Sequence, residues 1–257
     1  MSALDGARGD YLRATRSLRF AIFSAQLLAS YEAARLRTKA ERHDALRAEY
    51  KSRMGRGTLD VLGARLSWDG KIPRDTKAKL IVANHRSGLD IAVMLALFDA
   101  MLLSRADVAN WPVLGRLATH GGTLYVDRAD KNSGARAIRT IRRALAGGAS
   151  VCVFPEGTTA GGREVRPFHA GAFVAARGLD VEVLPVGFGY EHGSEWTEPT
   201  FTAHLANVAA REGAKIHACI GTPFALDMRA DEAAARARSE VAVLASRARA
   251  RLGAGQS

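Results

Sequence analysis

A histidine and an aspartate five positions apart, His85 and Asp90, form the sharpest chemical pattern in this sequence. They belong to the segment NHRSGLD, residues 84–90, which follows the apolar run 80–83 and leads into a stretch with helical spacing. This order predicts that His85 lies on a turn between a strand and a helix, where the active sites of α/β proteins gather. A carboxylate in the first helical turn can reach back to one imidazole nitrogen and leave the other free as a general base. The pair therefore predicts removal of a proton from a bound group. Other histidines, including His204, have no such context and are expected at the surface or in packing.

Two further polar segments follow apolar runs. FPEGTT, residues 154–159, has a proline that stiffens the chain, a glycine that permits close backbone approach, and polar side chains at Glu156 and Thr158. GTLYVDR, residues 122–128, ends in Asp127 and Arg128, and an arginine so placed suits bidentate binding of a phosphate. We expect both segments to meet the His85 turn at one edge of a sheet.

The elements that must position these residues are short strands alternating with helices. After Gly55 and Gly57 the pattern changes to β-like runs at 62–68, 80–83, 123–126, 151–154, 183–188 and 216–220, with helical stretches near 89–103, 135–145 and 170–176. This alternation predicts an α/β fold with a mostly parallel central sheet flanked by helices. We expect three parts: a basic helical arm at 1–56, the α/β domain at 57–228, and a C-terminal helix and tail at 229–257.

The charge of the chain indicates a polyanionic partner. There are 37 Lys and Arg residues against 26 Asp and Glu residues, a formal net charge of +11, and much of the excess precedes residue 57. There is no zinc-finger spacing or aromatic RNA-binding motif, and the basic region adjoins an apolar segment. We therefore expect an anionic membrane surface and no nucleic acid.

The apolar segment FAIFSAQLLASY, residues 20–31, is shorter than the roughly 20 apolar residues of a spanning helix. A secretion signal is not expected, because a strongly basic segment follows directly. Phe20, Phe23, Leu27 and Tyr31 form one helical stripe, which is typical of a face that inserts into lipid and equally of a face that packs on the core. We expect peripheral association with the cytoplasmic face of a membrane.

Cys152 and Cys219 lie in apolar runs and are expected to be small buried residues in a reducing compartment. Ser87 beside His85 suggests a serine hydrolase as an alternative class. However, side chains so close on one turn cannot easily form a hydrogen bond with each other, and there is no GxSxG segment. A metal hydrolase built on His85, Asp90 and Glu156 lacks a second histidine at ligand spacing. A lipid-binding protein without activity would not need the intact pair. We expect no metal and no cofactor.

At these segments the sequence resembles the glycerolipid acyltransferase family, and the lysophosphatidic acid acyltransferases in particular. NHRSGLD matches the family's NHxxxxD motif, GTLYVDR its FxxR block, FPEGTT its FPEGTR block, and LPVGF, residues 184–188, its fourth block around Pro185. Four blocks in family order make a specific match, which covers the α/β domain. The first sixty and last forty residues match only in general character.

The resemblance implies that His85 is the general base, that Asp90 orients it, and that the substrate-binding residues are Asn84, Arg128, Glu156, Gly157, Thr158 and Pro185. It also implies transfer of a fatty acyl group from acyl-CoA or acyl carrier protein to the hydroxyl of a lysophospholipid, first of all lysophosphatidic acid, which would give phosphatidic acid.

One departure bears on the acceptor. Thr159 stands where the family commonly has arginine, which removes a positive charge from the expected phosphate pocket. Arg163 or Arg166 would have to compensate, although each is expected to face solvent. A lyso-ornithine lipid or a lysophosphatidylcholine-like acceptor therefore stays open.

Overall fold

The computed structural model describes residues 3–127, 133–159, 161–191, 194–198 and 200–253, so that Arg128 lies outside the described residues. Helices and strands alternate along most of the chain. The elements are α1 (Ala3–Arg37), α2 (His43–Val61), β1 (Arg65–Asp69), β2 (Lys79–Ala83), α3 (Leu89–Leu97), β3 (Ala100–Arg105), α4 (Leu114–His120), β4 (Leu124–Val126), α5 (Ser133–Ala146), β5 (Ser150–Val153), α6 (Gly171–Ala176), β6 (Glu182–Tyr190), α7 (Phe201–Ala210), β7 (Lys215–Ile220), β8 (Phe224–Ala225) and α8 (Ala230–Gly253).

The strands form a mostly parallel sheet in the order β1-β7-β6-β2-β5-β3-β4, with β8 paired to β6. β2 lies between β5 and β6 and is parallel to both, whereas β6 is antiparallel to β7 and β8. Every residue of β2 is buried, as expected for a parallel strand covered on both faces. The predicted α/β class with a mostly parallel sheet is confirmed.

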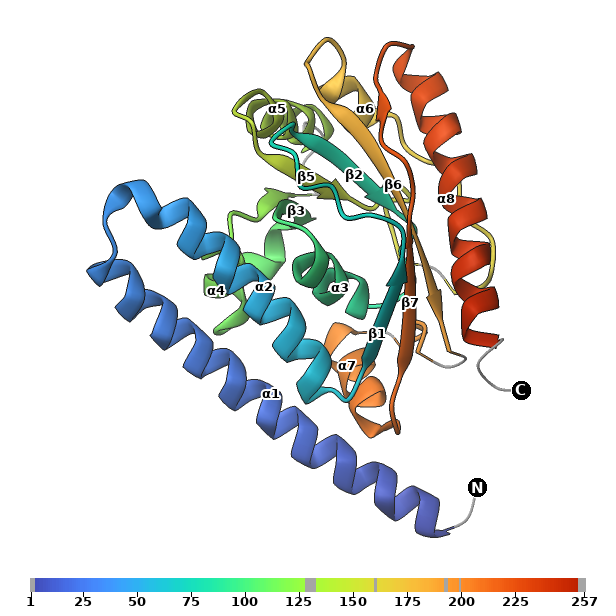
Figure 1. Ribbon diagram of the computed structural model, residues 1–257. Coiled ribbons are helices and arrows are strands. Elements are labelled where there is room, and N and C mark those ends of the chain that lie inside the picture. Colours follow the sequence, from blue (N-terminus) through green and yellow to red (C-terminus); the bar gives the residue numbers. More distant parts are fainter. Residues whose placement is uncertain (1–2, 128–132, 160, 192–193, 199, 254–257) are drawn as a thin grey trace.

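Helices cover both faces of this sheet. Alternate residues of β2 point to opposite sides: Ile81 joins a core beneath α3, whereas Leu80 and Val82 join a core beneath α5, α6 and α8. α8 runs along β6 and β7, while α1 and α2 form a long antiparallel pair beyond α3 (Figure 1). The His85 turn therefore joins a strand of the covered sheet to α3, which is itself packed against α2.

The prediction of one helix near 89–103 is wrong for its second half. α3 ends at Leu97, Phe98 adopts an extended backbone (φ −130°, ψ 139°), and residues from Ala100 form β3. Both pieces are short and apolar, and a short apolar run does not distinguish a buried helix from a buried strand.

The glycines at which the helical arm was expected to end lie inside α2. A Cβ atom on Gly55 would stand 2.4 Å from the backbone nitrogen of Ala96, and one on Gly57 would stand 2.2 Å from Cζ of Phe23. These positions are therefore glycine because α2 packs closely on α3 and on α1. Helix α2 continues to Val61, so the boundary placed at 57 does not coincide with the end of a helix.

The apolar stripe of residues 20–31 packs against the protein. Leu27 and Tyr31 are buried, and the ring of Phe23 lies over Gly57. Of the two interpretations of this stripe, packing on the core is the one that the structure supports.

Candidate active site

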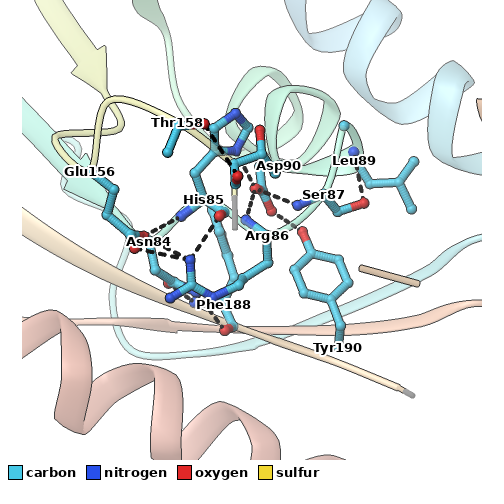
Figure 2. A network of polar contacts seen from close by, with 12 residues as sticks. Asn84, His85, Arg86, Ser87, Leu89, Asp90, Glu156, Thr158, Phe188 and Tyr190 are labelled. Atoms are coloured by element: carbon cyan, nitrogen blue, oxygen red, sulfur yellow. Dashed lines mark hydrogen bonds and ion pairs between the residues drawn. The ribbon is translucent and has the colours of Figure 1, made fainter. Parts of the chain in front are cut away.

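The site is built on the turn between β2 and α3. Because β2 lies between β5 and β6 in parallel register, the segments that leave β2 and β5 emerge at the same edge of the sheet. Residues 84–90 and the FPEGTT segment meet there, beside the end of β6 (Figure 2).

His85 and Asp90 are in direct contact. Nδ1 of His85 lies 2.6 Å from Oδ2 of Asp90, and the same oxygen accepts the backbone N–H groups of Arg86 at 2.7 Å and Ser87 at 3.0 Å. A carboxylate can only accept, so Nδ1 carries the proton and Nε2 keeps a free lone pair. The Asp90 side chain is fully buried and that of His85 is 15% exposed, so the pair reaches solvent through the imidazole.

Tyr190, at the end of β6, completes the environment of the carboxylate. Its hydroxyl donates to Oδ1 of Asp90 (Figure 2). Burial raises the pKa of Tyr190 well above its usual value, and the charge of Asp90 adds to this effect, so the hydroxyl stays a donor. No local sequence pattern marks Tyr190, because only the pairing of β6 with β2 brings it to Asp90.

The imidazole plane is fixed from the FPEGTT side. The ring of Phe154 stacks on His85, with the ring centres 4.2 Å apart and the planes inclined by 13°. The contacts with Asp90 and Phe154 together restrict the rotation of the His85 ring.

Glu156 ties the FPEGTT segment to the His85 turn. Oε1 accepts the backbone N–H of His85 at 2.8 Å, both carboxylate oxygens lie within 3.0 Å of Nη1 of Arg86, and Oε2 accepts the backbone N–H of Arg166 at 2.9 Å. Both side chains of the ion pair are buried, and such a pair is favourable only when its remaining donors and acceptors are well satisfied. These contacts argue for a positioning role of Glu156 in place of the expected contact with substrate.

The part of the chain that carries this arrangement is similar to known proteins. Residues 67–189 match the family model described as Acyltransferase, a range that contains both the His85 turn and FPEGTT. This segment, slightly less than half of the chain, is similar to acyltransferase domains and is called the acyltransferase domain from here on.

Similar proteins carry acyltransferase names. A 1-acyl-sn-glycerol-3-phosphate acyltransferase of Neisseria meningitidis is 31% identical over 150 residues, which are 58% of this chain and 59% of that protein. A lyso-ornithine lipid O-acyltransferase of Pseudomonas aeruginosa is 36% identical over 148 residues, or 54% of this chain and 55% of that protein. The matches thus span less than two thirds of these relatives.

The fold of the acyltransferase domain and its helices has a solved counterpart. The crystal structure of the 1-acyl-sn-glycerophosphate acyltransferase PlsC from Thermotoga maritima superposes with a TM-score of 0.74 at 20% identity, over 97% of this chain and 98% of that chain. This likeness concerns the fold.

Asn84 and Pro185 lie beneath the surface of the acyltransferase domain. The Asn84 amide donates to the backbone carbonyl of Phe188 at 3.1 Å and accepts its N–H at 2.7 Å, and the side chain is fully buried. Pro185 is a buried residue of β6. Their burial argues against the direct substrate contact expected of both, and the Asn84 contacts instead fix the end of β2 to β6.

Gly157 has a structural role in the loop after β5, whereas Thr158 in the same loop is exposed. Gly157 has a φ of +73°, and a Cβ atom there would stand 2.9 Å from Cδ2 of His169, so the position requires glycine. Thr158 is exposed and free to meet a substrate. Arg128, the expected phosphate ligand, is not among the described residues.

A second histidine holds the start of α3. Nε2 of His204 lies 3.0 Å from both Oγ of Ser87 and the backbone nitrogen of Gly88, and Nδ1 lies 3.0 Å from Oε2 of Glu198. Burial lowers the pKa of His204, which keeps it neutral and able to accept from Gly88. No sequence pattern indicates this role, since His204 lies on α7, more than a hundred residues after the His85 turn.

Ser87, His204 and Glu198 are linked in the same sequence of contacts as a serine hydrolase triad, but the serine is not accessible to a substrate. Ser87 and His204 have no exposed surface, and Nε2 of His204 already accepts a backbone N–H. A nucleophile must reach its substrate, so these contacts favour a positioning role for Ser87.

The oxygens of Asp90 and Glu156 are occupied by N–H and O–H donors, which argues against a metal hydrolase built on His85, Asp90 and Glu156. Elsewhere among the described residues, ligand atoms of Asp69, His217 and Cys219 lie within 4.8 Å of one another. There Nε of Arg251 donates to Asp69 at 2.7 Å, and its positive charge opposes a cation.

Proposed function

We propose that this chain is an O-acyltransferase that moves a fatty acyl group from a thioester carrier, acyl-CoA or acyl carrier protein, to the free hydroxyl of a lysophospholipid. Lysophosphatidic acid is the first acceptor proposed, with phosphatidic acid as the product. The acyltransferase domain and the names of its relatives support the reaction class. The contact of His85 with Asp90 is the observation that carries the mechanism.

In the proposed reaction, Nε2 of His85 takes the proton of the acceptor hydroxyl as its oxygen attacks the thioester carbonyl. The carbon–sulfur bond then breaks, and the imidazolium returns the proton to the departing sulfur, so that the carrier leaves as a thiol and His85 is neutral again. Asp90 keeps Nδ1 protonated and stabilises the imidazolium without taking the proton itself. General-base help of this kind is worth roughly a hundred- to ten-thousandfold in rate. No covalent acyl-enzyme is needed.

The test is transfer of a labelled acyl chain by purified full-length variants. His85→Ala should lose at least about a hundredfold in kcat, with an unchanged circular dichroism spectrum. Ser87→Ala should keep most of the activity, because Ser87 is a buried positioning group. Full activity of His85→Ala, or loss in Ser87→Ala as large as in His85→Ala, would reject the general-base mechanism.

Positive charge near the site bears on the acceptor. Arg163 and Arg166 are exposed. Burial lowers the pKa of Arg249, the like charges of Arg163 and Arg86 lower it further, and the charge of Glu195 acts in the opposite direction. Because Arg86 is buried and paired with Glu156, Arg163 and Arg249 are the charges left to repel each other. An anionic acceptor would relieve this repulsion, which supports a phosphate-bearing lipid despite Thr159.

A lyso-ornithine lipid is the second acceptor proposed. The missing arginine at Thr159 and the similarity to the Pseudomonas aeruginosa protein favour it. A panel of lysophosphatidic acid, lyso-ornithine lipid and lysophosphatidylcholine, each with acyl-CoA and with acyl carrier protein, separates the acceptors and the donors. If lysophosphatidic acid is the poorest acceptor in the panel, the first assignment falls.

We also propose peripheral association with the cytoplasmic face of a membrane, through the outer side of α1. Among the described residues, no helix is both long and apolar enough to cross a bilayer. The outer side of α1 nevertheless carries exposed apolar side chains at helical spacing: Tyr11 (68% exposed), Leu18 (62%), Ile22 (47%) and Leu36 (90%). Arg19 and Arg37 are exposed along one flank of this stripe, where they can meet anionic headgroups, whereas Arg8 on the same flank pairs with Glu212.

A further inference from the structure

A small cavity lies outside the site described above, where the α1–α2 pair meets α4. Its volume is about 290 Å³, and it shares no residue with the His85 turn. It is lined by Tyr31, Arg35, His43, Arg47, Thr119, His120 and Gly122. These residues come from three separate parts of the chain, so only the packing of the helical arm on the acyltransferase domain creates the cavity.

Positive charge dominates its walls. Within the described part of the chain, Arg35 forms no ion pair, and Arg47 pairs only with Asp44 at 3.2 Å. Asp44 is 89% exposed, so this pair holds Arg47 weakly. Near the cavity, the carboxylate of Glu32 binds Arg116 and contacts Nε2 of His120 at 3.3 Å. The guanidinium groups that remain available are therefore those of Arg35 and Arg47.

The donors in the cavity suit an anion with several oxygens. Two guanidinium groups can each present a pair of N–H donors to a tetrahedral oxyanion. His43 has Nε2 3.0 Å from the carbonyl oxygen of Thr38, which fixes its ring at the edge of the cavity. The volume lies at the lower end of small-molecule pockets, roughly 300–1,000 Å³, which suits a phosphate group with its water better than a fatty acyl chain.

We propose that this cavity is a second anion site of the protein, which binds a phosphate group. Two sources of phosphate meet the protein in the proposed function: the headgroup of an anionic phospholipid and the phosphates of coenzyme A. Arg35 adjoins Leu36, the last exposed apolar residue of the α1 stripe, so the site lies at the level of headgroups if that stripe meets lipid. The lipid source rests on the proposed membrane association, whereas the phosphate site itself does not.

The first experiment titrates the full chain with inorganic phosphate by calorimetry. Arg35→Gln and Arg47→Gln should each weaken binding, and the double variant should weaken it about tenfold or more, because each removes a charged donor pair. Arg139→Gln, an exposed arginine of α5 outside the cavity, is the matched control and should bind as the unaltered protein does. Equal affinity in the double variant and the control, or no binding by the unaltered protein, overturns the proposal.

The second experiment distinguishes the sources. Coenzyme A is compared with its form lacking the 3′-phosphate, and phosphatidylcholine vesicles containing phosphatidic acid are compared with vesicles of equal surface charge containing phosphatidylglycerol. If the double variant loses the preference for coenzyme A, the donor is the source, and if it loses the preference for phosphatidic acid, the headgroup is. Loss of neither preference rejects both sources, and the site is then one for free phosphate alone. His85→Ala should keep phosphate binding, so a failure of this site and a failure of the proposed catalysis are told apart.

Discussion

At the scale of single residues, the carboxylate of Asp90 is the most constrained group of the site. Its two oxygens accept from the His85 ring, two backbone N–H groups and the hydroxyl of Tyr190, all in a fully buried place. An oxygen so surrounded cannot turn, and the imidazole that depends on it cannot turn either. The orientation of the proposed base thus rests on donors that never touch a substrate.

Replacement of Tyr190 by phenylalanine tests this dependence. The variant removes one hydrogen bond from Oδ1 of Asp90, worth about 1–1.5 kcal/mol, so kcat should fall about tenfold while KM changes little. Tyr125→Phe, which removes a hydroxyl bound to Thr119 on α4, is the control and should keep its kcat. A change in KM alone would mean that Tyr190 contributes to substrate binding and not to the orientation of Asp90.

How much of this site the sequence predicts depends on distance along the chain. His85 and Asp90 lie within one turn and one helix start, so their contact follows from local geometry. Glu156 was expected at the same edge of the sheet, because its segment also follows an apolar run. Tyr190 and His204 reach the turn from β6 and α7, and nothing in their spacing encodes the topology that brings them there. The roles of His85 and Asp90 stay predictions until their variants are measured.

At the scale of elements, the close packing of α2 on α3 depends on Gly55. Gly55→Ala should lower the free energy of unfolding by about 1–3 kcal/mol, because the added methyl group would meet the backbone of α3. Gly134→Ala in α5 meets nothing within 4 Å and should be neutral or stabilising by up to about 1 kcal/mol. Urea unfolding measures both, and equal stability of the two variants would show that α2 can shift away from α3.

The anchor of α3 on α7 predicts a dependence of stability on pH. The pKa of His204 is lowered by burial from the ordinary value of 6.5, so the unfolded chain binds a proton that the folded chain does not. Stability is therefore complete above about pH 6.5 and falls as the pH drops below it. Hydrogen bonds with His204 and the backbone also lower the pKa of Glu198 despite its burial, which adds a loss of the same sign at lower pH. Thermal unfolding between about pH 7.5 and 5 should show this slope, and His204→Gln should flatten it.

Element types were predictable where an apolar run was bounded by turn residues, as at β2 and β5. They were not predictable where two apolar elements adjoin, as at α3 and β3, because a short apolar run has no polar positions that would separate the helical period from the strand period. The glycines of α2 misled for a related reason. A glycine that breaks a helix and one that lets another helix approach look the same in a sequence.

At the scale of the whole molecule, α1 has two apolar faces with different tasks. Leu27, 3% exposed, packs inward, whereas Leu18 and Ile22 point away from the protein. Replacing Leu18 and Ile22 by serine should reduce binding to anionic vesicles several-fold without changing the thermal unfolding temperature. Leu27→Ser should instead destabilise the fold.

Vesicle sedimentation at increasing salt separates the contributions of charge and of insertion. Binding that falls steeply with salt would indicate the basic flank, since screening acts on exposed charges within about 10 Å at 0.1 M. Unchanged vesicle binding by the Leu18 and Ile22 double variant would place the membrane-contacting surface elsewhere on the molecule.

The two cysteines have a practical consequence. Cys152 and Cys219 are almost completely buried, and burial raises the pKa of both thiols, so neither should react readily with a maleimide in the folded protein. The native cysteines should therefore not compete for a thiol-reactive label. A single cysteine introduced at position 36 would carry an environment-sensitive fluorophore near the C-terminal end of α1. Its emission would report how deep this end of the α1–α2 pair lies in a bilayer.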